Sequence, residues 1–364
     1  MPSAPGSESP ATSPASSPSF AARIVAWQRS HGRSSLPWQN TRDPYRVWLS
    51  EVMLQQTQVA TVLGYFARFL ARFPGVAELA AASEDEVFGL WSGLGYYSRA
   101  RNMHRCAQEV VARFGGAFPR SAAELQTLPG IGRSTAAAIA AFCFGERVAI
   151  LDGNVKRVLT RLLAFEGDLS SSAQERLLWQ EAGELLPHGG AADMIAYTQG
   201  LMDLGATVCL PRKPNCLICP VDALCRARRE GTPERYPVKT RKLRRTAESL
   251  WLLLARDGKG RVWLQKRPPR GVWAGLYCLP VFASRDELLA QLPEESHGSV
   301  RDEAAFVHVL THKDLHLHPV SAQLTGCAPG GEGGWYSQAE WSALGLPAPV
   351  RKLLASAAAP EAPA

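Results

Sequence analysis

Four of the eight cysteines in this 364-residue chain lie in one short segment, with the spacing Cys-x6-Cys-x2-Cys-x5-Cys. Four thiolates this close can surround one metal centre, and thiolates are soft ligands that suit zinc or an iron–sulfur cluster. Zinc modules more often use two Cys-x2-Cys pairs, and this segment has one such pair, which favours iron–sulfur. Cysteines used only for packing have no reason to cluster so densely. The candidate ligands are Cys209, Cys216, Cys219 and Cys225.

A lone acid, Glu51, is the only charged residue between Val47 and Leu63, and its helical neighbours are apolar. A carboxyl group buried on such a face loses hydration, which raises its pKa and lets it hold a proton. A general acid that works near neutral pH needs this property. The alternative interpretation is a buried glutamate that caps a backbone group.

A second candidate acid, Asp152, follows the apolar run Val148–Leu151 and precedes Gly153 and the basic pair Lys156-Arg157. An aspartate here could simply cap a helix, which is the commoner role at such a position. It could also face a positive charge that develops on a sugar during a reaction.

The segment Leu128–Thr135 has the sequence Leu-Pro-Gly-Ile-Gly-Arg-Ser-Thr and precedes an alanine-rich helix. Gly130 and Gly132 let the backbone approach an anion closely, and the helix start offers free N–H groups and the positive end of its dipole. Such a loop can hold a DNA phosphate without reading sequence. Taken alone, the pattern is also that of an ordinary tight turn.

The net charge of +7 is concentrated in one strip. Residues 226–245 hold nine Lys/Arg and two Glu, and 9 − 2 gives the whole excess of the chain. A basic strip suits a polyanion such as DNA, and a solvated linker is the alternative interpretation.

The pattern of elements divides the chain into a helical part and a part with strands. Helical spacing recurs from about Phe20 to Cys225, and past Arg245 the runs Leu250–Ala255 and Val262–Lys266 predict a hairpin.

No apolar run is long enough to span a membrane, and the start lacks the pattern of a signal peptide. We therefore expect a reducing cytoplasm, in which the scattered Cys106, Cys143, Cys278 and Cys327 are small buried residues. The predicted divisions are a disordered tail (1–19), a helical domain (20–228), a basic linker (229–246), a smaller α/β domain (247–358) and a second tail (359–364).

Further motifs identify a family. Pro37-Trp38-Gln39, the segment Leu49–Thr57, Gly93-Leu94-Gly95-Tyr96-Tyr97 and Leu151-Asp152-Gly153-Asn154 resemble the A/G-specific adenine DNA glycosylase (MutY) family. The cysteine spacing and the Leu-Pro-Gly-Ile-Gly hairpin resemble the endonuclease III superfamily to which it belongs. The resemblance covers nearly all of residues 22–356. It implies a mainly α helix–hairpin–helix glycosylase domain with a [4Fe–4S] loop, followed by a smaller α/β Nudix-like domain.

The same resemblance assigns catalytic roles. Glu51 takes the role of general acid, and then of base for the incoming water. Asp152 stabilises an oxocarbenium-like sugar or becomes a transient nucleophile, and Asn154 orients it. Retaining glycosidases hold such acids roughly 5–5.5 Å apart, and we expect a similar separation here. Bifunctional relatives have a lysine where this chain has Ser134, so we expect base release without strand cleavage.

Other positions inherit binding roles from the resemblance. Gln56 and Tyr96 would wedge into the base stack, although Tyr96 alone would look like a core aromatic. Trp38 and Gln199 would line an adenine pocket, since the base must leave the stack to react. In the α/β domain the family has a Phe-Ser-His loop that senses 8-oxoguanine, and this chain has Leu310 before Thr311 and His312. The glutamate-rich Nudix signature is missing, so this domain is expected to bind and not to hydrolyse.

The expected partner is double-stranded DNA with an adenine:8-oxoguanine or adenine:guanine mispair, bound by a monomer in the cytoplasm, at the nucleoid if the source is bacterial. One alternative is a bifunctional glycosylase for pyrimidine lesions, which Ser134 and the α/β domain disfavour. Another is a non-catalytic iron–sulfur DNA-binding protein, which the two acids in their motifs disfavour. The histidines in the α/β domain (His308, His312, His316 and His318) could form a metal site, but no Cys or acid cluster completes such a set.

Overall fold

The computed structural model describes residues 18–241, 244–324, 329 and 332–358. The chain forms two compact units, one from residues 1–34 and 145–239 and the other from residues 35–144 and 240–364. The predictions made for the two tails concern residues that, apart from 18 and 19, lie outside the described part of the chain, as does the prediction for Cys327.

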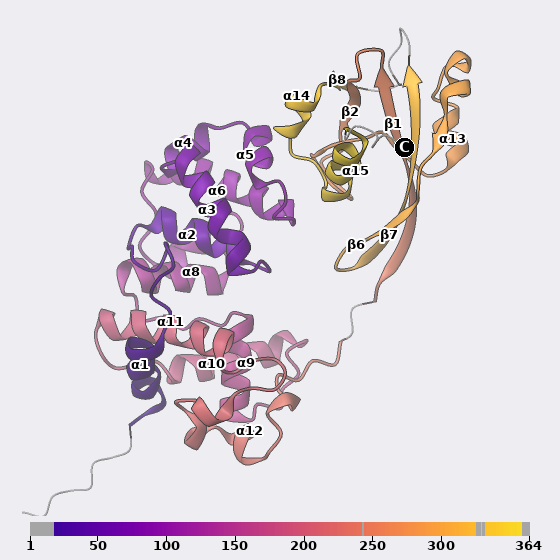
Figure 1. Cartoon of the computed structure of the whole chain (residues 1–364). Helices are drawn as coiled ribbons and strands as arrows, with labels where there is room; N and C mark the ends of the chain where they lie inside the picture. The colour runs from indigo at the N-terminus through magenta and orange to yellow at the C-terminus, as the bar shows by residue number, and fades with distance from the viewer. Residues whose placement is uncertain (1–17, 242–243, 325–328, 330–331, 359–364) are drawn as a thin grey trace, which may run out of the picture. The chain divides into compact units, whose positions relative to one another are not determined.

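The first unit is helical (Figure 1). Gly200 lets its helix approach the N-terminal helix closely, because a Cβ there would lie 2.8 Å from Ile24 Cγ2. Short 3-10 turns at Cys216–Ile218, Asp222–Leu224 and Pro233–Arg235 shape the cysteine-containing loop and the segment after it. The helices are α1 (Phe20–His31), α9 (Gly153–Leu163), α10 (Ser172–Glu184), α11 (Ala191–Thr207) and α12 (Arg226–Arg229).

The second unit begins with a group of helices whose core is rich in aromatic rings, including the fully buried Trp48, Phe69 and Trp91. A π-helical turn, Ala140–Phe144, continues its last helix. The helices are α2 (Pro44–Leu54), α3 (Val59–Arg72), α4 (Val76–Ala81), α5 (Glu84–Trp91), α6 (Tyr97–Phe114), α7 (Ala122–Leu125) and α8 (Arg133–Ile139).

The rest of the second unit contains a mixed sheet with the strand order β3-β2-β1-β7-β5. The long central strands β1 and β7 run parallel, and β1 pairs antiparallel with β2, as the predicted hairpin requires. In addition β4 pairs with β1, β6 with β7 and β8 with β2. The strands are β1 (Thr246–Asp257), β2 (Val262–Lys266), β3 (Tyr277–Cys278), β4 (Val281–Phe282), β5 (Arg301–Asp302), β6 (Phe306–Val309), β7 (Lys313–Leu324) and β8 (Gly334–Tyr336).

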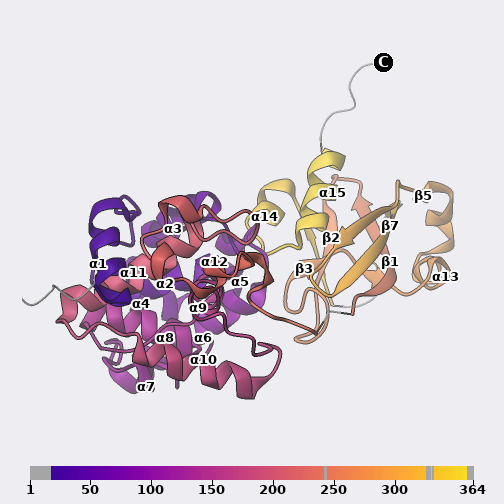
Figure 2. The same ribbon diagram turned by 90° about the horizontal axis from the view of Figure 1, so that it is seen from below.

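Each face of this sheet is covered by its own apolar core. Along β1 the buried leucines alternate, so that Leu252 and Leu254 face one core and Leu253 faces the other, as a strand with two buried faces requires. The helices α14 (Gln338–Ser342) and α15 (Ala348–Ala358) cover the first face, and α13 (Arg285–Leu289) covers the second, next to the 3-10 turn Glu294–Ser299 (Figure 2).

The predicted fold class is confirmed: a helical domain precedes a smaller domain built on a sheet. The described part of the sheet domain ends in a helix, α15. Among the described residues no helix is both long enough and apolar enough to cross a membrane.

Candidate functional site

Glu51 lies in the last turns of α2 and is half-buried. Asp43 caps the start of this helix by accepting from the backbone N–H of Tyr45 at 2.9 Å. The pKa of the Cys143 thiol is raised to about 12 by burial, with further contributions from the negative charges of Asp43 and Glu51. The Glu51 carboxylate is therefore close to the π-helical turn that continues α8, the helix of the predicted phosphate-binding hairpin.

Two predicted wedge residues share an uncommon backbone conformation. Gln56 and Tyr96 are left-handed, with φ of 57° and 47°, and both side chains are exposed, Tyr96 by 46%. A non-glycine residue in this region costs of order 1–3 kcal/mol and persists only when its surroundings determine it. An exposed, strained Tyr96 is not the core aromatic that its residue type alone would indicate.

A buried arginine, Arg99, holds both wedge segments. It comes from the first turn of α6 and is 8% exposed. Its guanidinium donates at 2.8–3.3 Å to oxygens at the end of α2, just after it, and in the loop before Tyr96: Val52 O, Met53 O, Thr57 Oγ1, Leu94 O and Gly95 O. Burial lowers the pKa of Arg99 to about 10, so the side chain stays charged at neutral pH. One cation thus fixes the two segments that carry Gln56 and Tyr96.

A cleft brings the wedge residues next to the hairpin. Gln56 and Tyr96 line it together with Asn102, Pro129 and Gly130. Gly130 has φ of 75°, and a Cβ there would lie 2.7 Å from Asn102 Cβ, so only glycine fits. Gly132 caps α8, and the space around its Cα is open. The half-buried Ser134 follows in the first turn, so the hairpin presents a bare backbone beside the wedge, as an anion-binding loop requires.

In the first unit Asp152 caps α9. Its Oδ1 accepts from the backbone N–H of Val155 at 2.7 Å, so the helix-cap interpretation is confirmed. Burial is the largest influence on its pKa and raises it, while backbone N–H groups of Val155 and Asn154 and the nearby Arg157 and Lys156 oppose that rise. The acid is therefore held in one rotamer in a poorly hydrated place.

The side chain of Asn154 is linked to Cys209 through Arg157. Its Oδ1 accepts from Arg157 Nη2 at 2.8 Å. The same arginine donates to the carbonyl oxygens of Gly205 at 2.7 Å and Cys209 at 2.8 Å. Asn154 approaches Asp152 through its backbone N–H, so its side chain supports the loop through Arg157. Glu51 and Asp152 belong to different units, and the short separation expected between their carboxylates stays a prediction.

The predicted ligands Cys209, Cys216, Cys219 and Cys225 line one cavity in the first unit. Arg161 donates to Cys209 Sγ at 3.3 Å, and Cys225 Sγ donates to the Arg161 carbonyl at 3.4 Å. Within the described part of the chain no three His, Cys, Asp or Glu side chains are placed to hold a metal ion.

The two residues expected at the adenine pocket lie in different units. Trp38 is buried, with its ring centroid 5.2 Å from that of Phe66. Gln199 Nε2 donates at 2.9 Å to Asp203, a fully buried carboxylate that also accepts from Arg33 Nε at 2.7 Å.

In the sheet domain the predicted lesion-sensing residues are exposed at the β6–β7 turn. Thr311 Oγ1 lies 2.9 Å from Tyr96 Oη, so the two hydroxyls share a hydrogen bond. Arg245, from the basic strip, donates to the Thr311 carbonyl at 3.0 Å, and the carbonyl of His312 accepts from Thr246 N at 3.1 Å. The structure thus brings together two residues that the sequence separates by 215 positions.

Several polar residues that hold these groups were not predicted from the sequence, notably Arg99, Arg157 and Asp203. Asp203 carries a signal of the kind that identified Glu51, because it is the only charged residue between Met194 and Pro211. Arg99 and Arg157 have no comparable signal, since Arg101 lies two residues after Arg99 and Lys156 lies next to Arg157.

Comparisons with known proteins show which families this chain resembles. Residues 49–183 match a family described as HhH-GPD superfamily base excision DNA repair protein, and residues 251–356 match a NUDIX domain. An adenine DNA glycosylase of Buchnera aphidicola subsp. Acyrthosiphon pisum is 35% identical over 92% of this chain and 96% of that protein. The adenine DNA glycosylase of Homo sapiens is 45% identical over 59% of this chain and 40% of that protein. The structure of a thermostable thymine-DNA glycosylase matches with a TM-score of 0.52 and 28% identity, over 58% of this chain and 95% of that chain.

We expect Arg99→Met to lower the free energy of unfolding by about 2–4 kcal/mol, because several carbonyl groups lose a charged donor in a buried place. Urea unfolding measures this. The control is Arg113→Met, on the same helix; the Arg113 side chain is 48% exposed and pairs with Glu109. This substitution should change stability by less than about 0.5 kcal/mol. Equal effects of the two substitutions would contradict the conclusion that Arg99 holds the two segments together.

We expect Asp152→Asn to be more stable than the wild type at neutral pH. Because the pKa of Asp152 is raised in the folded state, the folded chain binds this proton more tightly than the unfolded one. The stabilisation is therefore present below the ordinary aspartate pKa of about 3.9 and is lost as the pH rises through the folded value. Asparagine keeps an oxygen that can cap α9 and carries no charge.

The gain in the free energy of unfolding from Asp152→Asn should shrink when unfolding is measured at successively lower pH. Asp302→Asn is a control of opposite sign, because Arg285 lowers the pKa of Asp302 and the neutral variant should gain nothing at neutral pH. A wild type as stable as Asp152→Asn at neutral pH would contradict the burial argument.

Proposed function

Because the chain belongs to the adenine DNA glycosylase family, we propose that it is a monofunctional glycosylase that hydrolyses the N-glycosidic bond of adenine mispaired with 8-oxoguanine or guanine. The observation that carries the proposal is the match to a relative named adenine DNA glycosylase along nearly the full length of both chains. Glu51 and Asp152 stand in the motifs that carried the resemblance, and DNA is the macromolecular partner that a base excision DNA repair family implies.

In this proposal Glu51 begins the reaction as general acid. It is half-buried on a helix whose neighbouring residues are apolar, and poor hydration favours a carboxyl group that keeps its proton. Protonation of the adenine ring makes the base a better leaving group. After the base has left, the Glu51 carboxylate can accept a proton from the attacking water.

Asp152 faces the charge that develops on the sugar. The cap hydrogen bond fixes its rotamer, and an electrostatic attraction is stronger in a poorly hydrated site than in water. The raised pKa of Asp152 reflects the cost of keeping its charge there, and an approaching sugar cation would offset this cost. A transient bond from Asp152 to the sugar would follow the two-carboxylate pattern of retaining glycosidases.

The adenine must leave the base stack before it can react. The strained and exposed Gln56 and Tyr96 would occupy the space that it leaves, while Trp38 and Gln199 would line its pocket. With its amide nitrogen held by Asp203, Gln199 keeps an oxygen that can accept from the exocyclic amine of adenine. Gly130, Gly132 and Ser134 would hold a phosphate at the start of α8.

No lysine stands at position 134, and this supports release of the base without strand cleavage, since a Schiff base requires an amine. Opposite the adenine, Thr311 and His312 would contact 8-oxoguanine. We further propose that the enzyme acts as a monomer, in the cytoplasm or at the bacterial nucleoid.

The four cysteines fit a [4Fe–4S] cluster. A single zinc ion needs every sulfur about 2.3 Å from one point, whereas a cluster binds each thiolate to a different iron atom. Four thiols that line one cavity suit a cluster, and the segment has one Cys-x2-Cys pair where zinc modules more often have two. Cys209, Cys216, Cys219 and Cys225 would hold the cluster, which when bound would fold the loop before the basic strip. Arg161 would orient Cys209 and Cys225 through its two contacts.

The decisive assay incubates the protein with a duplex that contains adenine opposite 8-oxoguanine, and measures free adenine and strand breaks before alkali treatment. We expect adenine without breaks. Glu51→Gln should lower the rate of adenine release by at least about 100-fold while DNA binding persists. Immediate strand breaks would identify a lyase, and an active Glu51→Gln variant would overturn the assignment of the acid.

Purified protein should contain about four iron atoms and four acid-labile sulfides, as measured by chemical analysis, if the cysteines hold one cluster of this type. Cys219→Ser should lose most of both, because a thiolate ligand is replaced by a hydroxyl group. Cys106→Ser, at a buried cysteine outside the cavity, is the matched control and should keep them. Zinc in place of iron, with no sulfide, would exclude the cluster.

A further inference from the structure

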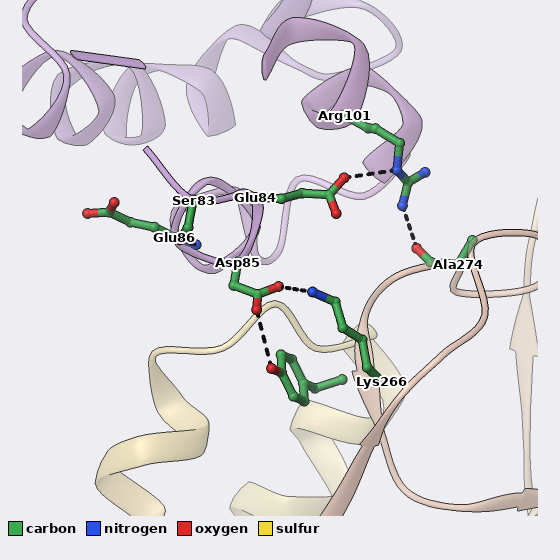
Figure 3. A network of polar contacts seen from close by, with 8 residues as sticks. Ser83, Glu84, Asp85, Glu86, Arg101, Lys266 and Ala274 are labelled. Carbon is green, nitrogen blue, oxygen red and sulfur yellow. Dashed lines mark hydrogen bonds and ion pairs between the residues drawn. The ribbon is translucent and has the colours of Figure 1, made fainter. Parts of the chain in front are cut away.

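The helices α5 and α6 bind the sheet domain through a polar network at the start of α5 (Figure 3). Asp85 Oδ1 pairs with Lys266 Nζ at 2.5 Å, and Asp85 Oδ2 accepts from Tyr277 Oη at 3.2 Å. From α6, Arg101 pairs with Glu84 at 3.1 Å and donates to the carbonyl of Ala274 at 2.7 Å. Two helices of the glycosylase domain therefore hold strands β2 and β3 and the loop between them.

A second set of contacts lies at the other end of α5. Arg351 Nε, from α15, donates to Ser92 Oγ at 3.0 Å. Tyr97 Oη, from the first turn of α6, donates to the carbonyl of Leu346 at 3.1 Å. Here the backbones come very close, since a Cβ at Gly89 would lie 2.2 Å from the carbonyl oxygen of Ala343. Close backbone approach and directional hydrogen bonds together leave little freedom for sliding.

Tyr96 lies between these anchors in the sequence. The loop that carries it runs from Ser92 to Tyr97, and both of these residues contact the sheet domain. The same domain places Thr311 Oγ1 at 2.9 Å from Tyr96 Oη. The element that presents the wedge is therefore the element on which the lesion-sensing domain is anchored.

We propose that the anchor formed by Asp85, Lys266, Ser92 and Arg351 determines mispair specificity, by holding Thr311 at a fixed place beside Tyr96. The ligand class is the purine opposite the adenine, and 8-oxoguanine is distinguished from guanine by hydrogen bonding to Thr311. This inference rests on the proposed function. The anchor residues are positioning residues: they need not touch DNA, and they act through the placement of Thr311.

Hydrogen-bond geometry explains why mispair specificity should depend on the placement of Thr311. A hydroxyl must lie within about 3.2 Å of its partner, with good alignment, to contribute, so a domain that shifts by an ångström loses the discrimination. Release of adenine opposite guanine does not use an 8-oxo group, and it should depend much less on this placement. Loss of the anchor should therefore reduce the preference for adenine opposite 8-oxoguanine over adenine opposite guanine. It should reduce the overall activity less.

The test measures single-turnover rates of adenine release from the two mispairs with the full chain, and takes their ratio. Asp85→Asn and Lys266→Met should each lower the ratio by about two- to five-fold, the range expected for a partly exposed ion pair. The double variant should lower it little further, because either change breaks the same contact. The rate with adenine opposite guanine should stay within about two-fold in these variants.

Glu86→Gln is the matched control. Glu86 lies one residue further along α5, and its carboxylate pairs with Arg72 at 2.5 Å, within the helical domain. It points away from the sheet domain (Figure 3). This variant should keep the wild-type ratio, so that an effect of changed charge on α5 is separated from an effect of the anchor.

A double-mutant cycle tests whether the anchor acts through Thr311. Thr311→Val removes the hydroxyl group at nearly constant volume and should lower the ratio in the wild-type background. In the Arg351→Met background, where the anchor is already weakened, the same substitution should lower the ratio much less. Additive effects would overturn the proposal, as would anchor variants that keep the full ratio or that slow both mispairs equally.

Failure of this inference is distinguishable from failure of the proposed function. A wild type that releases no adenine, or that shows no preference for 8-oxoguanine, overturns the proposed activity or specificity and this inference with it. A wild type with a clear preference that survives in folded anchor variants overturns the inference alone. The wild-type Lys266 side chain is 43% exposed, so Lys266→Met should fold. This variant can be tested even if another anchor variant does not fold.

Discussion

Arg99 brings a positive charge into the interior of the helical domain, and the geometry of the predicted wedge depends on how that charge is satisfied. Burying a cation is costly unless it is well hydrogen-bonded. Four backbone carbonyls and one hydroxyl accept from its Nη1 and Nη2 groups, and they can do so only while the end of α2 and the loop before α6 stay close together. The desolvation cost of one guanidinium thus becomes a constraint on two segments. Each segment carries an exposed residue with positive φ, Gln56 or Tyr96.

The first unit uses the same chemistry around the cysteines. Arg161 is 2% exposed and donates to the carbonyls of Leu210, Pro211 and Tyr236 and to Cys209 Sγ. Arg157 gathers the carbonyls of Gly205 and Cys209 with the amide of Asn154. A planar guanidinium with five donors can collect several loop carbonyls at fixed angles. In both units, then, irregular backbone is held by arginines from neighbouring helices, and this explains how exposed loops can carry well-defined groups.

The sequence predicts some of this structure well and some of it poorly, for physical reasons. The spacing of Cys209 to Cys225 and the lone charge of Glu51 are local patterns, and the structure gathers the cysteines around one cavity. The short apolar run Leu250–Ala255 predicts β1, because a strand that is buried on both faces is apolar along its whole length. The left-handed Gln56 and Tyr96 have no local signal, since their residue types do not favour positive φ. The Asp85–Lys266 pair joins residues 181 positions apart, and two exposed charges of opposite sign could equally have remained solvated.

Asp152 shows why a helix cap and a catalytic carboxylate need not be alternatives. A cap requires an oxygen held at the helix N-terminus by backbone N–H groups, and these groups fix the rotamer. A group that stabilises a cation must likewise be fixed, and it must also be poorly hydrated. Burial raises the pKa of Asp152, while the N–H groups of Val155 and Asn154 lower it, so the cap helps to keep the buried carboxyl group ionised. The local hydrogen bonds that a sequence pattern predicts for an ordinary cap are therefore the same bonds that make a charged Asp152 possible in this place.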